Sequence, residues 1–116
     1  MNDVTIFHNP QCSTSRKTLE IIREAGIEPE IVLYKDTGWT AEALKGLAQR
    51  AGVPVAAFLR AKEPLAAELG LRDPDVSEGA LLKAMIEHPI LVERPIVATP
   101  KGVVLARPQD RVREVL

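Results

Sequence analysis

Cysteine is nearly absent from this sequence of 116 residues, in which Cys12 is the only one. A lone cysteine cannot form an internal disulfide, a CxxC redox pair or a thiolate-rich zinc site. The two histidines and the scattered acidic residues show no spacing of the zinc-ligand type, so we expect no metal. Any redox chemistry at Cys12 must therefore take its second thiol from another molecule.

Long apolar runs and an excess of one charge are also missing. No stretch approaches the roughly 18 apolar residues of a membrane span, and the N-terminus lacks the basic region and apolar stretch of a signal peptide. A net charge of -1 argues against a basic nucleic-acid-binding protein. We therefore expect a cytoplasmic protein that binds neither membranes nor nucleic acids. Because 46% of the residues are hydrophobic, we also expect one folded domain over residues 1–116.

The first third of the chain has the pattern of a parallel strand–helix–strand unit. Residues 4–8 are β-branched and aromatic and stop at Asn9-Pro10, which predicts a strand. Apolar residues at helical spacing predict a helix over 13–25, ended by Gly26. The apolar run 30–34 then predicts a second, buried strand.

The rest of the chain is first helical and then strand-like. Helices are predicted over 41–51 and 77–88, with Thr40 and Ser77 as N-caps, and short helical pieces over 54–61 and 64–69. Two strands, 95–99 and 103–107, are joined by the tight turn 100–102 as a hairpin, and a short helix starts at Pro108. The order predicts an α/β fold with a mixed four-stranded sheet and a helical insertion at about residues 40–92.

Cys12 lies between the first predicted strand and the first predicted helix. A helix N-terminus stabilises a thiolate and binds anions, although a free cysteine can also be a small buried apolar residue. Arg16 and Lys17 occupy the first helical turn, where acidic residues are the usual choice. With the hydroxyls of residues 13–15, they indicate an anion-accepting loop, the alternative being a solvated helix start. Thr18 stands where a phosphatase-type CxxxxxR loop has its arginine, which excludes that loop.

A few other polar residues stand at element boundaries. His8 ends the first predicted strand, where it could stabilise a thiolate, move a proton or be a structural residue. His88 precedes a proline at a helix end and is interpreted as a cap or packing residue. Three arginines also stand at element boundaries: Arg60, Arg94 and Arg107. If they converged in the fold, they would suit a tetrahedral oxyanion; the alternative is that they are solvated surface residues. Arg94 precedes Pro95, and that bond could be cis.

These motifs resemble a known family over essentially the whole chain. The segments that carry the resemblance are HNPQCSTSR at 8–16, HPILVERPIV at 88–97, and Arg107-Pro108. They resemble the glutaredoxin-coupled arsenate reductase family of thioredoxin-fold proteins. The resemblance implies a thioredoxin-like sheet and a reaction in which Cys12 attacks arsenate, glutathione displaces the adduct, and a glutaredoxin completes reduction to arsenite.

The resemblance also implies roles for single residues. Cys12 matches the nucleophile, His8 the histidine that tunes it, and Ser15 a hydroxyl near the thiolate. The oxyanion pocket is expected from Arg60, Arg94 and Arg107, with Arg16 in the loop and Pro95 as a structural residue. Glutathione is the implied co-substrate, with no tightly bound cofactor. Longer family members carry a C-terminal extension, whose absence we expect to affect packing or partner contacts rather than chemistry.

Two other interpretations stay open. Related transcriptional regulators bind RNA polymerase and sense oxidation through CxxC, but Ser15 stands at the position of the second cysteine, which leaves only a redox-insensitive binding role. A related thiol reductase of another substrate is the second alternative. The three arginines argue against it, because disulfide exchange requires no oxyanion site.

Overall fold

The computed structural model describes residues 3–116 and divides the chain into two compact units. The first unit combines the chain up to Thr37 with Arg94–Leu116, and the second is Gly38–Glu93. The first unit thus joins the two ends of the sequence, with the second inserted between them. The insertion agrees closely with the predicted helical segment at about residues 40–92.

The first unit is built on a mixed four-stranded sheet, as predicted. Its strands are β1 (Thr5–Phe7), β2 (Glu30–Val32), β3 (Ile96–Thr99) and β4 (Gly102–Leu105), in the order β2-β1-β3-β4. β1 pairs parallel with β2 and antiparallel with β3. β3 and β4 form the predicted hairpin, which closes with Thr99 opposite Gly102. The parallel pair ends next to the β1–α1 loop, where the site lies.

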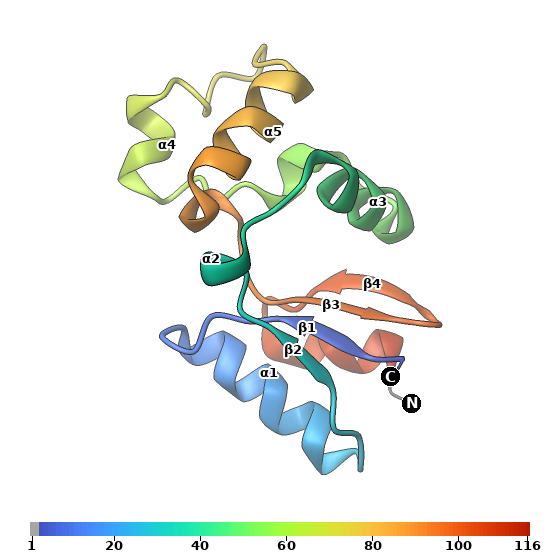
Figure 1. Cartoon of the computed structure of the whole chain (residues 1–116). Coiled ribbons are helices and arrows are strands. Elements are labelled where there is room, and N and C mark those ends of the chain that lie inside the picture. The colour runs from blue at the N-terminus through green and yellow to red at the C-terminus, as the bar shows by residue number, and fades with distance from the viewer. Residues whose placement is uncertain (1–2) are drawn as a thin grey trace. The chain divides into compact units, whose positions relative to one another are not determined.

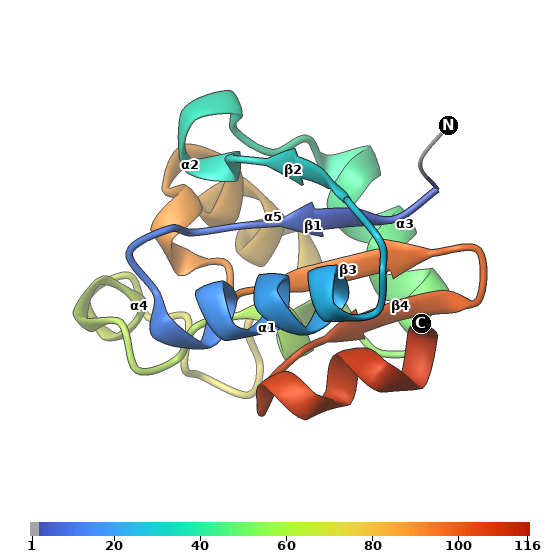
Figure 2. The ribbon, with the colours of Figure 1, turned by 90° about the horizontal axis from the view of Figure 1, so that it is seen from below.

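Two helices cover one face of this sheet. α1 (Ser13–Glu24) and the 3₁₀ helix η3 (Gln109–Val115) lie side by side across it, as Figures 1 and 2 show. The core beneath them contains Ile6, Val97 and Val104, which are neighbours in the strand register. Ile22 of α1 packs into the same cluster and is 0% exposed. This core fixes α1, and with it the start of the helix at Cys12, against the sheet.

The second strand differs from its prediction. It ends at Val32, and Tyr34 instead begins a short helix, α2 (Tyr34–Thr37). The strand is also not buried, because β2 is at the edge of the sheet and its Ile31 is 37% exposed. The apolar run predicts a buried strand, but pairing on one side only leaves an edge strand open to solvent.

The C-terminal segment also differs in detail. η3 is a 3₁₀ helix rather than an α-helix, and Pro108 is its N-cap, with extended backbone, rather than its first helical residue. The bonds Arg94–Pro95 and Arg107–Pro108 are both cis.

The second unit is helical, as predicted. It contains α3 (Ala41–Ala51), η1 (Val55–Phe58), α4 (Pro64–Glu68), α5 (Glu78–Glu87) and η2 (Pro89–Leu91). Both predicted N-caps are confirmed, since the Thr40 and Ser77 hydroxyls accept hydrogen bonds from the backbone three residues on. His88 forms the junction between α5 and η2, where its backbone N–H donates to the Ala84 carbonyl at 2.8 Å. No helix within residues 3–116 is long and apolar enough to cross a membrane.

Candidate active site

Cys12 is the N-cap of α1 and is half-buried. Its backbone N–H donates to the Asn9 carbonyl at 3.0 Å, which closes the turn made by Asn9-Pro10-Gln11. The Arg16 N–H in turn donates to the Cys12 carbonyl at 3.0 Å, the first hydrogen bond of the helix. The thiol therefore lies where the unpaired N–H groups of a helix N-terminus point and where the helix dipole favours negative charge.

The pKa of the Cys12 thiol is lowered below its ordinary value. Burial is the largest single influence and by itself raises that pKa, but two backbone N–H groups, a guanidinium and a neighbouring positive charge together outweigh it. In decreasing order of effect, these groups are the Ser15 backbone N–H, the Arg107 guanidinium, the Thr14 backbone N–H and the positive charge of Arg94. The site thus increases the fraction of nucleophilic thiolate at neutral pH.

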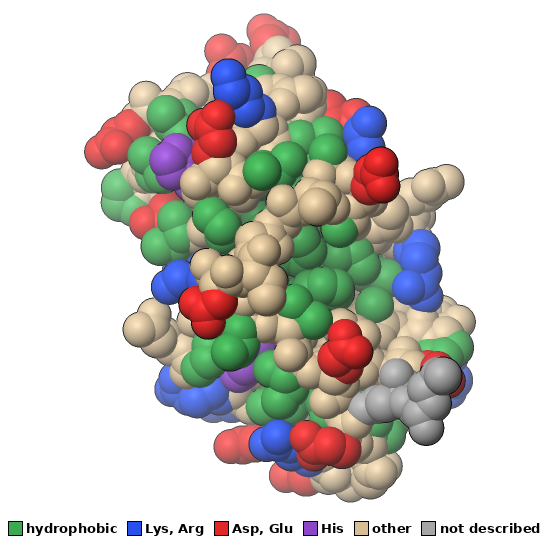
Figure 3. Space-filling view, viewed as in Figure 1, with side chains coloured by type: hydrophobic (Ala, Val, Ile, Leu, Met, Phe, Trp, Pro, Cys, Tyr) green, Lys and Arg blue, Asp and Glu red, His purple; other side chains and the backbone are tan. Residues whose placement is uncertain are grey.

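Arg107 is the cation in contact with the sulfur. One of its terminal nitrogens, Nη1, lies 3.7 Å from Cys12 Sγ and 3.0 Å from the Arg94 carbonyl oxygen, to which it donates. Arg94 is itself buried, at 8% exposure, and its charge also lowers the Cys12 pKa. The structure therefore brings two of the three predicted arginines to the cysteine. Figure 3 shows Lys and Arg side chains gathered at the end of the first unit where α1 begins.

Ser15 and His8 form a buried pair beside the thiol. His8 Nδ1 lies 2.6 Å from the Ser15 hydroxyl, which also accepts from the Asn9 N–H at 3.1 Å. Ser15 is fully buried, and within residues 3–116 its hydroxyl hydrogen has no other acceptor than Nδ1. We therefore assign the hydroxyl as donor to Nδ1, which leaves His8 neutral with its proton on Nε2.

The electrostatics agree with a neutral His8. Its pKa is lowered, first by burial and then by the positive charges of Arg23 and Arg16. The Ser15 hydroxyl contacts His8, and the backbone N–H of Ser15 contacts the sulfur of Cys12. The pair thus holds the β1–α1 loop in place around the cysteine.

Two predicted oxyanion ligands have partners elsewhere. Arg16 is exposed and donates from Nη1 to the Pro10 carbonyl at 2.7 Å, so its side chain braces the loop. Arg60 belongs to the second unit, where Nη1 donates to Glu93 at 2.7 Å and Nε lies 3.7 Å from Glu63.

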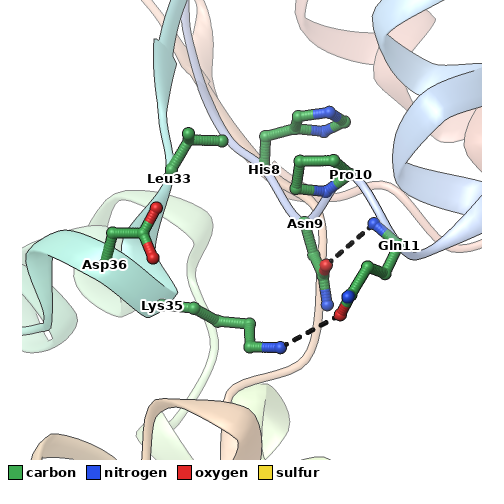
Figure 4. A pocket seen from close by; sticks show the side chains of 7 residues that line it. All are labelled: His8, Asn9, Pro10, Gln11, Leu33, Lys35 and Asp36. Carbon is green, nitrogen blue, oxygen red and sulfur yellow. Dashed lines mark hydrogen bonds between the residues drawn. The ribbon is translucent and has the colours of Figure 1, made fainter.

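The sequence analysis did not identify a group of polar residues next to the β1–α1 loop at residues 8–12, which we call the cysteine loop. Lys35 Nζ donates to Gln11 Oε1 at 3.3 Å, and Asn9 Oδ1 accepts from the Gln11 N–H at 3.0 Å. Asp36 lies beside them (Figure 4). The signal that could have found Lys35 and Asp36 was their position after a strand parallel to β1, because parallel strands end at one edge of the sheet. The sequence predicts that strand to Tyr34, whereas it ends at Val32, and this difference hid the position of Lys35 and Asp36.

This fold and site define a class of protein. It comprises small α/β proteins with one activated thiol at a helix N-terminus, supported by guanidinium groups that can bind an anion. A thiolate in such a setting can attack an electrophilic oxyanion and form a covalent adduct. A second thiol is needed to resolve the adduct, and Cys12 is the only cysteine in the chain.

Comparison with known proteins identifies the family. The family model of ArsC matches residues 7–115. The arsenate reductase of Rhizobium meliloti (strain 1021) is 48% identical over 113 residues, covering 97% of this chain and 81% of the relative. Arsenate reductase ArsI1 of Synechocystis is 45% identical over 115 residues, covering 99% and 80%. A solved structure of arsenate reductase from Vibrio cholerae superposes with a TM-score of 0.93 at 45% identity and covers 97% of each chain. The chain belongs to the ArsC family, and the predicted thioredoxin-like α/β fold is confirmed.

Proposed function

We propose that this protein is an arsenate reductase. The observation that carries the proposal is the Cys12 thiol, with its lowered pKa and the Arg107 guanidinium 3.7 Å from its sulfur, in a chain of the ArsC family. The relatives and the solved structure described above are named arsenate reductases, at 45–48% identity over nearly the whole chain. Arsenate is a tetrahedral oxyanion, and guanidinium N–H groups match its oxygens.

The proposed reaction has two steps, formation of a Cys12–arsenic adduct and its resolution by a second thiolate. The Cys12 thiolate attacks arsenic(V), a sulfur–arsenic bond forms, and one arsenate hydroxyl takes up a proton from solvent and leaves as water. A second thiolate then attacks the Cys12 sulfur, so that a disulfide bond forms and the sulfur–arsenic bond breaks. The electron pair of that bond stays on arsenic, which is reduced to arsenic(III) and leaves as arsenite. Cys12 is left in a mixed disulfide, and a further thiol must release it.

Glutathione is the proposed second thiol, and a glutaredoxin is the proposed reductant of the mixed disulfide. Cys12 is the only cysteine of the sequence, so neither step can use an internal thiol. A chemistry that consumes reduced thiols requires a reducing compartment, and we place the protein in the cytoplasm. Arg94 and Arg107 supply the proposed oxyanion pocket in the first unit.

The test is arsenate-dependent NADPH oxidation with glutathione, glutathione reductase and a glutaredoxin. Wild type is compared with Cys12→Ser, and each component is omitted in turn. We expect turnover that requires Cys12, arsenate, glutathione and glutaredoxin. Arg107→Ala is expected to reduce kcat/KM for arsenate by about tenfold or more, because a charge-assisted contact is lost at the reacting sulfur.

Absence of arsenate turnover would distinguish among the alternative functions. If folded wild-type protein shows no turnover with several glutaredoxins, arsenate reduction is rejected. Protection of Cys12 from alkylation by arsenate or sulfate then separates the alternatives. Saturable protection would indicate a related reductase of another oxyanion, whereas its absence would favour a thiol reductase or an RNA-polymerase-binding role.

A further inference from the structure

A small pocket opens between the cysteine loop and the segment that follows β2. Its volume is about 290 Å³, and its lining comes wholly from the first unit. Figure 4 shows His8, Asn9, Pro10 and Gln11 on one side and Leu33, Lys35 and Asp36 on the other. This volume is at the lower limit of small-molecule sites, which begin at about 300 Å³, so it suits a small ligand or one end of a peptide.

The pocket carries one charge of each sign. Lys35 and Asp36 are both exposed, and within residues 3–116 neither makes an ion pair. Among the described residues, the hydrogen-bond partner of the Lys35 ammonium is the uncharged Gln11 amide, at 3.3 Å. An inorganic oxyanion would gain from Lys35 but would be repelled by Asp36. A ligand that carries both a carboxylate and an ammonium group complements both residues.

We propose that this pocket binds the α-amino-acid end of the γ-glutamyl thiol that resolves the Cys12 adduct. Lys35 and the Gln11 amide bind the α-carboxylate, Asp36 binds the α-ammonium group, and Leu33 and Pro10 contact the methylene groups. The inference rests on the proposed function, because it assigns a site to the second thiol of that reaction. A pocket of this kind would distinguish glutathione from thiols without an amino-acid end.

The position of the pocket agrees with this role. Four of its lining residues, His8 to Gln11, directly precede Cys12 in the chain, and adjacent Cα atoms are about 3.8 Å apart. In glutathione, the thiol lies roughly two residue lengths, about 7 Å, from the γ-glutamyl α-carbon. The span of glutathione therefore exceeds the Cα spacing between Gln11, which lines the pocket, and Cys12.

The first experiment measures binding without turnover. Cys12→Ser protein is titrated with S-methylglutathione by NMR, in the otherwise wild-type background and with Lys35→Ala or Asp36→Asn added. Each pocket substitution is expected to weaken binding by roughly tenfold, because it removes a charge-assisted contact. Lys45→Ala and Asp75→Asn make the same changes at exposed sites of the second unit and are expected to have no effect. Unchanged binding in both pocket variants would overturn the proposal.

The second experiment measures turnover in the Cys12 protein. Lys35→Ala and Asp36→Asn are expected to raise KM for glutathione about tenfold and to leave KM for arsenate unchanged. Resolution of the adduct by 2-mercaptoethanol, which lacks the amino-acid end, is expected to stay at the wild-type rate. An equal loss with both thiols would contradict the assignment.

The two proposals fail separately. Loss of S-methylglutathione binding in the pocket variants, together with no arsenate turnover by wild type, would keep the pocket and reject the reductase. Normal arsenate turnover with unchanged glutathione KM in both variants would keep the reductase and reject the pocket.

Discussion

At the scale of single residues, the lowered pKa of Cys12 comes from opposing influences on one sulfur. Burial disfavours the thiolate, while the helix N–H groups and the Arg107 guanidinium favour it and outweigh burial. The N–H groups come with any cysteine at this position of a helix. Arg107 is different, because it is 95 residues away in the sequence and reaches the sulfur only in the folded chain.

Replacement of Arg107 provides a direct test of that influence. In Arg107→Ala, the Cys12 pKa is expected to rise, and alkylation by iodoacetamide at neutral pH should slow by about fivefold, the equivalent of roughly 1 kcal/mol. The measurement is the alkylation rate as a function of pH. Arg111→Ala, which removes an exposed arginine of η3 paired with Glu114, serves as the control and should behave as wild type. A wild-type profile in Arg107→Ala would contradict the role given to this contact.

The lowered pKa also links Cys12 to stability. Because the folded thiol has a lower pKa than the unfolded one, its thiolate stabilises the folded state at pH values above the unfolded pKa. That contribution is lost as the pH falls through the folded pKa. The free energy of unfolding of wild type relative to Cys12→Ser should therefore increase with pH across the interval between the two values, as measured by urea unfolding.

At the scale of elements, the strongest sequence signals were those that act within a few residues. Thr40 and Ser77 cap their helices, and Gly52 ends α3 with a φ of 70° that favours glycine. The hairpin turn at residues 100–101 is equally local. The predictions that the structure corrects are those in which a neighbour distant in sequence decides whether a segment is buried or exposed. An apolar run such as 30–34 is compatible with a buried or an edge strand, and only the strand order places β2 at the edge.

The N-cap of α3 is open to a simple test. Thr40→Ala removes the hydroxyl that accepts from the Ala43 N–H at 3.1 Å, and it should lower the free energy of unfolding by about 1 kcal/mol. Thr40→Ser keeps the acceptor and should stay close to wild type. Chemical denaturation followed by circular dichroism measures both variants. Equal stability of all three proteins would show that the hydroxyl does not stabilise the helix.

At the scale of the whole molecule, the sheet core of the first unit carries the site. Ile22 lies at the centre of that core, and α1 begins at the cysteine loop. Ile22→Ala should lower the free energy of unfolding by about 2–5 kcal/mol, since it leaves a cavity between α1 and the sheet. Ile86→Ala, at a position that is 38% exposed, makes the same change and should cost much less. Thermal unfolding distinguishes the two, and similar losses would argue against Ile22 as a core residue.

The sequence by itself determined the features that depend on neighbours along the chain. These include the strand–helix junction that places Cys12 at an N-terminus, the helix caps, the hairpin, and the absence of an internal disulfide that follows from a single cysteine. Local backbone preferences and composition are enough to decide them.

Only the tertiary structure decided what surrounds the sulfur. The contact of Arg107 with Cys12, the use of the Ser15 hydroxyl by His8, and the pocket between Gln11 and Lys35 depend on where side chains from separate segments meet. Residue types alone could not decide these partners, because an arginine or serine has several possible partners of similar energy. The packing of α1, η3 and the strands around a common core selects among them.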